Sequence, residues 1–592
     1  MNHIIIYDHM QAGWLSFRDP LEVITARAPG DVISALQRLD QAVQSDNIFA
    51  AGWICYEAAP AFDPALRVRG PGKVPLLCFG LFPSYTRLNR LPIGNTSYKV
   101  GEWTADISRD IYDDAVDRIR KYLADGHTFQ VNYTHRLHAD FKGSAVSYFQ
   151  DLHQAQMGRF GVYADTDDFA VCSVSPELFF TLEGPCLRSR PMKGTCRRGR
   201  FFMEDVQYRK RLMISEKERA ENLMIVDMVR NDMGRIAETG TVCVEQLFIT
   251  EQYPTVWQMT STICAETRVS IPEIFGAMFP FASVTGAPKP RTMEIIAELE
   301  ASPRGIYTGT LGYWGRGRNA QFNVAIRTVT IDKKANRAEY GVGGGIVWDS
   351  DPGREYLECG VKAGVLTLRR PAFSLNEAIL WTPEQGFFLL DYHMRRMIRS
   401  AAYFQYPFNV DEIENALKAS ADSLQGESHK IRLMLYLDGS FDIEPVAVSS
   451  IPVTDPCRIR LAASPVFSDD VFLYHKTSHR RQYDQAATGV KECDDVLFWN
   501  EQGEVTEFTS SNAVFKIRGK MVTPPVECGL LPGTFRAWLL DRGEVEERVI
   551  AVDELRACDA VYLINSVRRW RAGILPDEPG TFGKRRFKKM AP

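Results

Sequence analysis

The chain has 592 residues, of which 45% are hydrophobic and 24% charged, and its formal net charge is −4. At ~100–200 residues per domain, this length excludes a single hydrophobic core and predicts at least two large domains. The slightly acidic balance gives no reason to expect a nucleic acid or an anionic membrane as partner, and no apolar stretch of ~18 residues predicts a transmembrane helix.

The cysteines and the first residues both predict a cytoplasmic protein. Twelve cysteines are scattered singly without a CxxC pair, so we expect reduced thiols rather than a zinc site or a disulfide framework. The N-terminal segment, Met1–Trp14, lacks the basic region of a signal peptide. Near the other end, the basic run Lys584–Lys589 is expected to be a solvated tail.

Strands and helices alternate along the first part of the chain. Phe169–Ser173 and Phe322–Ile326 are rich in β-branched and aromatic residues, which predicts strands. Apolar spacing predicts a long helix from Ser215 to Ile236, and Ser215 followed by Glu218 predicts a capping box at its start.

The domain boundary is predicted after residue 370. A strand-like run, Val365–Leu368, ends there, and the short proline-containing linker Arg369–Ala372 precedes a new αβ pattern. The prediction therefore divides the chain into residues 1–370 and 371–592.

Several segments of the first domain combine glycine, proline and charge in ways that core packing does not require. They are Ser175–Phe179, Arg190–Thr195, Glu216–Asp232, Ser283–Lys289, Ala325–Thr328, Gly343–Ile346 and Glu355–Glu358.

Three of their glutamates predict a site for a hard divalent cation. Glu355 and Glu358 lie three apart and would share one face of a helix, and with Glu218 they could hold Mg²⁺, which prefers oxygen ligands. The glycine run offers backbone N–H groups to a carboxylate, and Arg327 could grip one in a bidentate manner. Taken singly, each feature could equally be a helix cap, a solvated helix face, a tight turn or a structural ion pair.

In this order, the segments resemble the chorismate-utilising enzymes. That family includes anthranilate synthase component I, aminodeoxychorismate synthase component I, and the isochorismate and salicylate synthases. The resemblance covers Thr128 to Leu368 and implies an α/β fold of the chorismate-utilising, β-sandwich-like type around a chorismate pocket. It implies magnesium ligands at Glu218 and Glu358 with Glu355 beside them. The substrate contacts that it implies are Arg327, Gly344, Gly345, Tyr307 and Thr285.

Lys193 distinguishes among the members of this family. Aminodeoxychorismate synthases carry lysine in the Pro-x-Lys-Gly-Thr motif where anthranilate synthases carry alanine, so an anthranilate or salicylate synthase is disfavoured. The resemblance implies that Lys193 attacks C2 of chorismate as the C4 hydroxyl leaves, with Glu177 as the acid, and that ammonia then adds at C4 and expels the lysine. The alternative is that Lys193 only balances nearby carboxylates.

The sequence departs from the family pattern at two places, and it also bears on where the nitrogen comes from. Gln258 stands in a segment where many relatives carry histidine, so proton transfer is not expected there. The N-terminal region is shorter than in free-standing synthases, which argues against an allosteric amino-acid pocket. No glutaminase signature is visible in the sequence, so ammonia is expected from solution or from a separate glutamine amidotransferase subunit.

The second domain combines residues suited to pyridoxal phosphate. The pattern predicts a helix at Tyr392–Tyr403 and a strand at Ile431–Leu437. The cofactor needs a lysine, an acidic partner for its pyridine nitrogen and donors for its phosphate. Lys476, Glu507 and the Gly533-Thr534 turn, where a helix would begin, supply one of each. Alone, these residues could be a surface lysine, a loop glutamate and an ordinary helix start.

Their order and spacing resemble the class IV aminotransferase family of fold type IV, from Leu375 to Leu575. That family includes branched-chain and D-amino acid aminotransferases and aminodeoxychorismate lyase. The resemblance implies a pyridoxal phosphate-dependent domain in which Lys476 is the Schiff-base lysine and proton carrier and Glu507 pairs with the pyridine nitrogen. It implies phosphate contacts from Arg396, Gly533 and Thr534, with Asn565 and Ser566 lining the same pocket. Such domains commonly dimerise, so the expected assembly is a homodimer through the C-terminal domain.

The pairing of the two domains predicts a route from chorismate to p-aminobenzoate for folate synthesis. The first half would make 4-amino-4-deoxychorismate, and Lys476 of the second would remove its C4 proton so that pyruvate leaves and the ring becomes aromatic. The alternatives are a second half that is an amino acid aminotransferase or inactive, and a non-catalytic ligand-binding or scaffold protein that has kept the fold.

Overall fold

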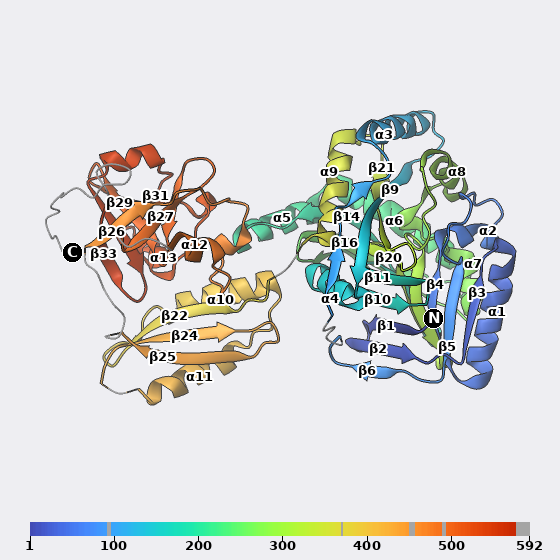
Figure 1. Ribbon diagram of the computed structural model, residues 1–592, viewed down its shortest axis with the longest axis horizontal. Coiled ribbons are helices and arrows are strands. Elements are labelled where there is room, and N and C mark those ends of the chain that lie inside the picture. The colour runs from blue at the N-terminus through green and yellow to red at the C-terminus, as the bar shows by residue number, and fades with distance from the viewer. Residues whose placement is uncertain (92–95, 369–370, 425, 449–455, 488–492, 576–592) are drawn as a thin grey trace. The chain divides into compact units, whose positions relative to one another are not determined.

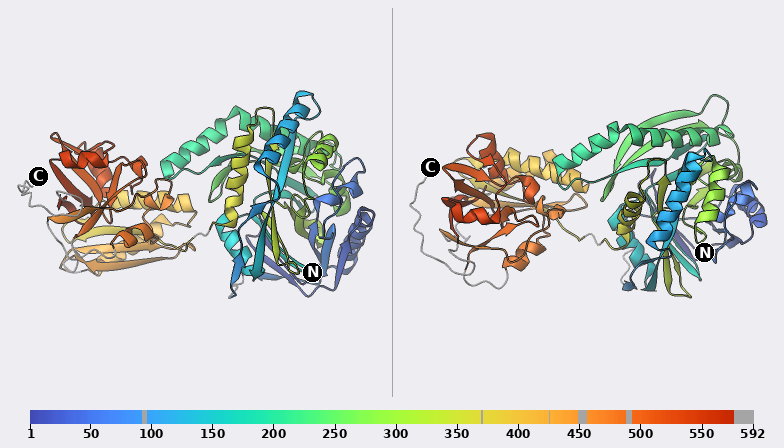
Figure 2. Two further views of the ribbon diagram at one scale, coloured as in Figure 1. Left: turned by 45° about the horizontal axis from the view of Figure 1, so that its top comes forward. Right: turned by 90° about the horizontal axis from the view of Figure 1, so that it is seen from above.

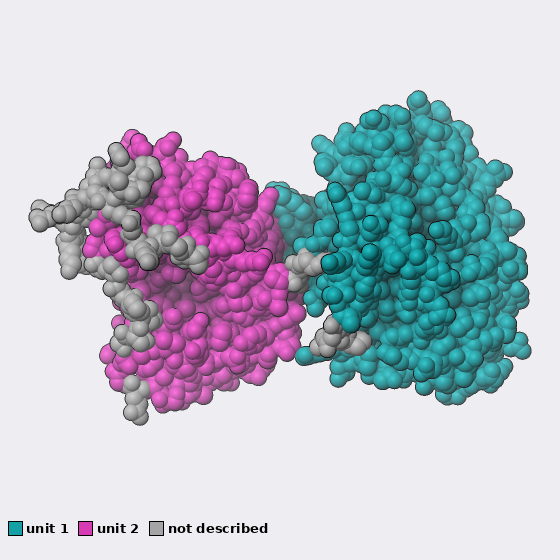
Figure 3. All heavy atoms as spheres, in the orientation of Figure 1, with its two compact units in different colours: residues 1–198, 208–370 teal, residues 199–207, 371–592 magenta. Residues whose placement is uncertain are grey.

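The protein is represented by a computed structural model that describes residues 1–91, 96–368, 371–424, 426–448, 456–487 and 493–575 (Figure 1). The chain forms two compact units, one of residues 1–198 and 208–370 and one of residues 199–207 and 371–592 (Figure 3). No local sequence pattern indicates that segment 199–207 belongs to the second unit. Within the described residues, no helix combines the length and the apolar character that a membrane crossing requires.

Two antiparallel sheets form the framework of the first unit (Figures 1 and 2). In spatial order, the first sheet contains β17 (Gly286–Ala287), β9 (Gln130–Gly143), β21 (Arg337–Ile346), β20 (Thr328–Asp332), β11 (Phe169–Ser175), β10 (Phe160–Asp165), β1 (His3–Asp8), β2 (Gly13–Arg18) and β6 (Thr86–Leu88), with β7 (Tyr98–Val100) and β8 (Thr104–Ala105) paired to β9. The second contains β14 (Met192–Arg197), β16 (Val256–Glu266), β13 (Cys186–Arg190), β12 (Leu178–Glu183), β19 (Asn319–Val324), β18 (Thr310–Gly315), β4 (Phe49–Ile54), β5 (Leu77–Phe82) and β3 (Glu22–Ala26), with β15 (Cys243–Gln252) paired to β16.

Helices cover these sheets and contribute to two hydrophobic cores. They are α1 (Pro29–Asp46), α2 (Ala59–Phe62), α3 (Arg109–Ala124), α4 (Ala145–Gln156), α6 (Glu216–Gly234), α7 (Ile271–Met278), α8 (Lys289–Leu299) and α9 (Pro352–Ala363), while α5 (Phe202–Ile214) begins in segment 199–207. Strand β1 shows why a strand between the two cores is apolar on both faces. Ile4 and Ile6 point into the core that contains β12, α1 and α7, whereas Ile5 points into the core that contains α3 and α4.

The second unit consists of two smaller sheets with their helices. One sheet has the order β23 (Gly386–Phe387), β22 (Leu375–Thr382), β24 (His429–Leu435) and β25 (Phe441–Ala447), and α10 (Leu390–Phe404) and α11 (Val410–Asp422) pack on it. The other has the order β28 (Val505–Phe508), β27 (Asp495–Trp499), β26 (Cys457–Leu461), β33 (Arg569–Ile574), β32 (Ala560–Asn565), β29 (Asn512–Ile517), β30 (Lys520–Thr523) and β31 (Glu546–Glu547). Helices α12 (Arg481–Ala487) and α13 (Thr534–Asp541) accompany it.

The predicted strand at Val365–Leu368 is wrong. Helix α9 continues there into a 3-10 turn, Gly364–Leu366, and Val365 and Leu366 are buried in the core beside α3 and α4. A short apolar run is compatible with a buried strand or a buried helical turn. Here the run directly follows α9, so the helical conformation continues into it.

The predicted helices and remaining strands are confirmed with small shifts, but the capping box is only half formed. The Ser215 hydroxyl accepts a hydrogen bond from the Glu218 N–H at 3.4 Å, as predicted. The Ser215 N–H, however, donates to the Leu212 carbonyl, because α5 ends immediately before α6. The Glu218 carboxylate therefore does not accept the Ser215 N–H, and its role as a predicted metal ligand is considered below.

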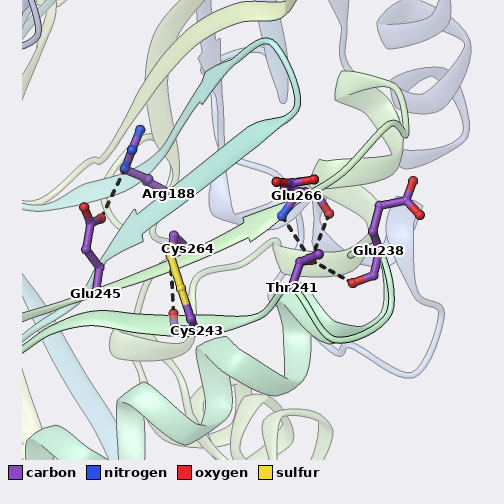
Figure 4. Close-up of a disulfide and its surroundings, with 7 residues drawn as sticks. All are labelled: Arg188, Glu238, Thr241, Cys243, Glu245, Cys264 and Glu266. Atoms are coloured by element: carbon purple, nitrogen blue, oxygen red, sulfur yellow. Dashed lines mark hydrogen bonds and ion pairs between the residues drawn. A yellow bond between two sulfur atoms is a disulfide. The ribbon is translucent and has the colours of Figure 1, made fainter.

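The prediction that all thiols are reduced is wrong for one pair. Cys243 and Cys264 face each other on β15 and β16 and form a disulfide (Figure 4). No second disulfide is formed within the described residues. The basic run Lys584–Lys589 lies outside the described residues.

Candidate functional sites

The first unit contains a cavity of about 190 Å³ lined by most of the residues predicted for chorismate and magnesium. They come from the β11–β12, α8–β18 and β19–β20 connections and from β14, α6, β21 and α9: Glu177, Lys193, Glu218, Tyr307, Arg327, Gly344, Gly345, Glu355 and Glu358. Thr285, predicted to bind substrate, does not line this cavity. Its hydroxyl donates to the Phe281 and Ala282 carbonyls, because the 3-10 turn Ala282–Val284 directs it back into the chain.

Glu177 is a buried acid at this cavity. Its N–H donates to the Ser175 hydroxyl at 3.2 Å, and its carboxylate accepts the Met192 N–H at 3.0 Å. Burial raises the pKa of Glu177 to about 7, although the Met192 N–H and the charge of Lys193 oppose the shift. A carboxyl group in this condition can still carry a proton near neutral pH.

Lys193 lies on β14 and points toward the glycine run of β21. Its side chain is 15% exposed, and its Nζ lies 3.7 Å from a carboxylate oxygen of Glu221. A methyl group added at Gly345 would overlap this Nζ. Glycine at 345 therefore keeps open the space into which the lysine reaches.

The glycine run forms an open edge of the first sheet. Strand β21 pairs with β9 as far as Ile346, but its pairing with β20 stops at Tyr340. Residues 341–346 are therefore paired on one side only, and residues 341–345 line the cavity. A side chain at Gly343 would overlap the Tyr133 carbonyl, so close pairing with β9 requires glycine there.

Arg327 is a buried cation at the cavity wall. Its backbone has a φ of 50°, its side chain donates to the Gln156 amide oxygen, and burial lowers its pKa. None of the described residues places a carboxylate within ion-pair distance of it. A substrate carboxylate would supply the missing counter-charge.

The three predicted metal ligands line the cavity without forming a ready coordination shell. Burial raises the pKa values of Glu218 and Glu355, and neighbouring carboxylates add to both shifts. Lys362, whose Nζ lies 2.7 Å from Glu358, lowers the pKa of that residue. Throughout the described part of the chain, no group of three or more His, Cys, Asp or Glu residues is arranged to hold a metal. The donor chemistry suits Mg²⁺, and Lys362 forms an ion pair with Glu358.

Sequence reasoning missed Gln130 and Lys362. Gln130 is fully buried, and neither the oxygen nor the nitrogen of its amide group has a hydrogen-bond partner. A methyl group added at Gly345 would overlap both the Gln130 amide nitrogen and the Lys193 Nζ, so these two side chains lie on the same side of Gly345. Gln130 begins β9, a strand with many polar residues, so no local pattern distinguishes it. Lys362 also donates to the Gly343 carbonyl at 2.9 Å, and its spacing of four from Glu358 could have identified it. Gln258 lines the same cavity and accepts a hydrogen bond from Thr195.

The second unit contains a cavity of about 330 Å³ lined by every residue predicted for pyridoxal phosphate: Arg396, Lys476, Glu507, Gly533, Thr534, Asn565 and Ser566. Burial and the nearby Arg396 lower the pKa of Lys476 to about 8, which raises the fraction of neutral amine at neutral pH. Its backbone is held by a hydrogen bond from the Asn376 N–H to the Lys476 carbonyl.

Glu507 is positioned as the acidic partner in this cavity. Its two carboxylate oxygens accept hydrogen bonds from the Tyr483 hydroxyl at 2.7 Å and the Asn512 amide at 3.1 Å. Burial raises its pKa to about 7. A bound pyridinium would stabilise the charged form of Glu507.

The predicted phosphate contacts meet at the start of α13. Gly533 caps this helix, and a side chain there would overlap the Asn512 amide oxygen. Arg396 is held against Glu377 by two hydrogen bonds of 2.8 and 2.6 Å and also donates to the Pro532 carbonyl, which aims it at this turn. A helix N-terminus beside an arginine suits a phosphate.

Asn565 and Ser566 shape another part of the wall. The Asn565 side chain accepts the N–H groups of Val567 and Arg568, and the Ser566 hydroxyl donates to the Ala378 carbonyl on β22. Lysine, acid and phosphate turn all face one cavity, so the residues of this unit fit pyridoxal phosphate.

Comparison with protein families finds one match in each unit. Residues 93–367 match the sequence model of the chorismate binding enzymes, and residues 374–573 match that of the amino-transferase class IV family. Both predicted resemblances are thereby confirmed.

Individual relatives agree with the first assignment. The chain is 38% identical over 269 residues to aminodeoxychorismate synthase component 1 of Klebsiella aerogenes, covering 45% of this chain and 59% of that protein. It is 37% identical over 266 residues to anthranilate synthase component 1 of Aquifex aeolicus, covering 45% and 53% respectively. The chain thus spans a little over half the length of these relatives, and identity alone does not choose between their activities.

A solved structure supports the predicted fold class of the first unit. The crystal structure of anthranilate synthase component I from Streptococcus pneumoniae TIGR4 is similar with a TM-score of 0.54 and 23% identity, covering 62% of this chain and 92% of that one. The mixed α/β sandwich is therefore the fold of the chorismate-binding enzymes.

Proposed function

Since residues 93–367 match the chorismate binding enzymes and residues 374–573 match the class IV amino-transferases, we propose that the chain converts chorismate to p-aminobenzoate in two steps. The first unit aminates chorismate to 4-amino-4-deoxychorismate. The second unit removes pyruvate from that product. The observation that carries the proposal is Lys193, which reaches into the first cavity beside the buried acid Glu177.

In the first unit, each residue has a role that its surroundings permit. Arg327 and the open edge of β21 hold the substrate carboxylates. Lys193 forms a bond to C2 while Glu177 gives its proton to the C4 hydroxyl, which leaves as water. Ammonia then bonds to C4, and the bond between C2 and the lysine nitrogen breaks. Mg²⁺, when bound by the carboxylates of α6 and α9, would neutralise substrate carboxylate charge.

In the second unit, the residues hold the cofactor and move one proton. Pyridoxal phosphate supplies an electron sink when bound. The Gly533-Thr534 turn and Arg396 hold its phosphate, and Glu507 faces its pyridine nitrogen. Lys476 takes the proton from C4 of the substrate, after which the ring becomes aromatic as pyruvate departs.

The nitrogen is proposed to come from a separate glutamine amidotransferase subunit. The support is similarity to proteins named component 1, which implies a second component. Ammonium in solution would replace that subunit in an assay.

The first test is incubation of the purified protein with chorismate, ammonium, Mg²⁺ and pyridoxal phosphate, followed by chromatography. We expect p-aminobenzoate and pyruvate in equal amounts. Accumulation of 4-amino-4-deoxychorismate would leave the second unit as an amino acid aminotransferase or an inactive domain. Anthranilate as product would contradict the role given to Lys193.

Glu177 gives a prediction about pH. Because an acid donates only when protonated and the pKa of Glu177 is raised to about 7, kcat/KM for chorismate amination should fall as pH rises through about 7. The rate must be corrected for the fraction of ammonium present as ammonia, which rises over the same range. Glu177→Gln should lower the rate by about 10²–10⁴-fold and remove this limb. A pH profile unchanged in that variant would exclude Glu177 as the acid.

A further inference from the structure

The second cavity carries more positive charge than one phosphate requires. Its lining includes one carboxylate, Glu507, and six lysine or arginine side chains: Arg396, Lys430, Lys476, Arg480, Arg568 and Arg571. Glu377 neutralises Arg396, and Lys476 has its own role. A cavity of this charge is suited to a ligand with several negative groups.

Lys430 is the residue whose placement is most informative. It lies on β24 opposite Leu380 of β22, and its neighbours Ile431 and Leu433 point into the core under α10 and α11. Because side chains alternate along a strand, Lys430 faces away from that core and lines the cavity. Ala378, on the same face of β22, lines it too.

Lys430 shares its part of the wall with Arg568. The Asn565–Arg568 turn is tied to β22 by the Ser566 hydroxyl, which donates to the Ala378 carbonyl at 3.3 Å. Burial lowers the pKa of Lys430, and the charges of Arg432 and Arg568 lower it further. No described residue places a carboxylate within ion-pair distance of Lys430. The elements that build this wall differ from the start of α13, where the phosphate contacts lie.

We propose that Lys430, with Arg568 beside it, forms a carboxylate subsite that makes this cavity selective for amine substrates with two carboxylates. The inference rests on the proposed function, because 4-amino-4-deoxychorismate carries one carboxylate on its ring and one on its enolpyruvyl side chain. One carboxylate can meet the Lys430 wall while the C4 proton faces Lys476. An amino acid with a single carboxylate leaves one of these positions unfilled.

The test compares Lys430→Met with Arg432→Met in the full-length protein loaded with pyridoxal phosphate. Arg432 lies two residues away on the same face of β24, but it is exposed, pairs with Glu444 at 3.2 Å and does not line the cavity. With supplied 4-amino-4-deoxychorismate and no ammonium, Lys430→Met should raise KM about tenfold or more and change kcat less than KM. The estimate follows from the loss of a charge-assisted hydrogen bond. Arg432→Met should leave KM within about twofold, and Lys430→Arg should restore most of the affinity.

A second readout uses chorismate as an inhibitor of the same step. Chorismate carries the same two carboxylates as the substrate, so Lys430→Met should weaken its inhibition and Arg432→Met should not. An unchanged KM in Lys430→Met, or equal inhibition by chorismate in the two variants, would overturn the subsite.

Failure of the proposed function has a different signature. It would appear as no p-aminobenzoate from 4-amino-4-deoxychorismate in the unmodified protein. The subsite would then be judged by the absorbance of bound pyridoxal phosphate on addition of L-glutamate or L-alanine. A response at lower concentration to the dicarboxylate, lost in Lys430→Met, supports the subsite. Equal responses to the two amino acids refute it.

Discussion

Lys193→Ala is expected to abolish the amination of chorismate while the protein stays folded. The side chain reaches into the cavity beside Glu177 and Gly345, and its removal takes away the proposed nucleophile. The loss should be on the order of 10³-fold or more in the rate of 4-amino-4-deoxychorismate formation, measured by chromatography with saturating ammonium. Because Arg327 is unchanged in this variant and still lines the cavity, chorismate should still bind.

Lys217→Ala is the matched control for this variant. Lys217 approaches the same partner as Lys193, with its Nζ 4.0 Å from Glu221, but its side chain is 56% exposed. Its removal should cost a few-fold at most, since exposed ion pairs contribute only ~0.2–1 kcal/mol. Conversion of supplied 4-amino-4-deoxychorismate to p-aminobenzoate should be normal in both variants. If Lys193→Ala aminated chorismate at the normal rate, Lys193 would not be the nucleophile of the first step.

Lys476→Ala should stop the second step and leave the first intact. Lys476 is the buried lysine of the second cavity, with a pKa lowered to about 8 by burial and by Arg396, which suits it to accept a proton. Its loss should reduce p-aminobenzoate formation on the order of 10³-fold or more, so that 4-amino-4-deoxychorismate accumulates from chorismate and ammonium. The absorbance band of a lysine-bound cofactor should also disappear, which is a readout independent of activity.

Lys520→Ala serves as the control for this second variant. Lys520 is 71% exposed and pairs with Glu546 at the edge of the same unit. Both the cofactor absorbance and the yield of p-aminobenzoate should be unchanged by its removal. If Lys476→Ala kept the absorbance band and the normal yield, the role proposed for the second unit would be wrong.

The local parts of the two proposed sites were readable from the sequence. Lys193 and Glu177 lie in short segments where proline, glycine and charge occur together. Such segments can be recognised without knowledge of the tertiary structure. The same kind of short-range pattern predicted the helix that begins at Thr534 and the shared helix face of Glu355 and Glu358. It also carried the family resemblance of each half.

The partners of these side chains could not be predicted from the sequence, because a motif does not specify which distant residues its side chains contact. Arg396 was expected to hold a phosphate and lines the cavity, but its ion pair with Glu377 depends on how α10 packs on β22. Thr285 belongs to a motif of the first cavity, yet its hydroxyl points back to Phe281. Lys362 engages Glu358 where a cation was expected.

Length and local pattern thus determined the two-part organisation and the segments that carry the chemistry, and the resemblance of those segments to known families implied the fold class. Only the tertiary structure decided which distant residues meet. The pairing of β9 with β21 brings Gln130 to Gly345, the pairing of β15 with β16 joins Cys243 to Cys264, and the pairing of β22 with β24 sets Lys430 into the second cavity. Strand register is set by contacts between residues far apart in the chain, and a single sequence carries no local signal for them.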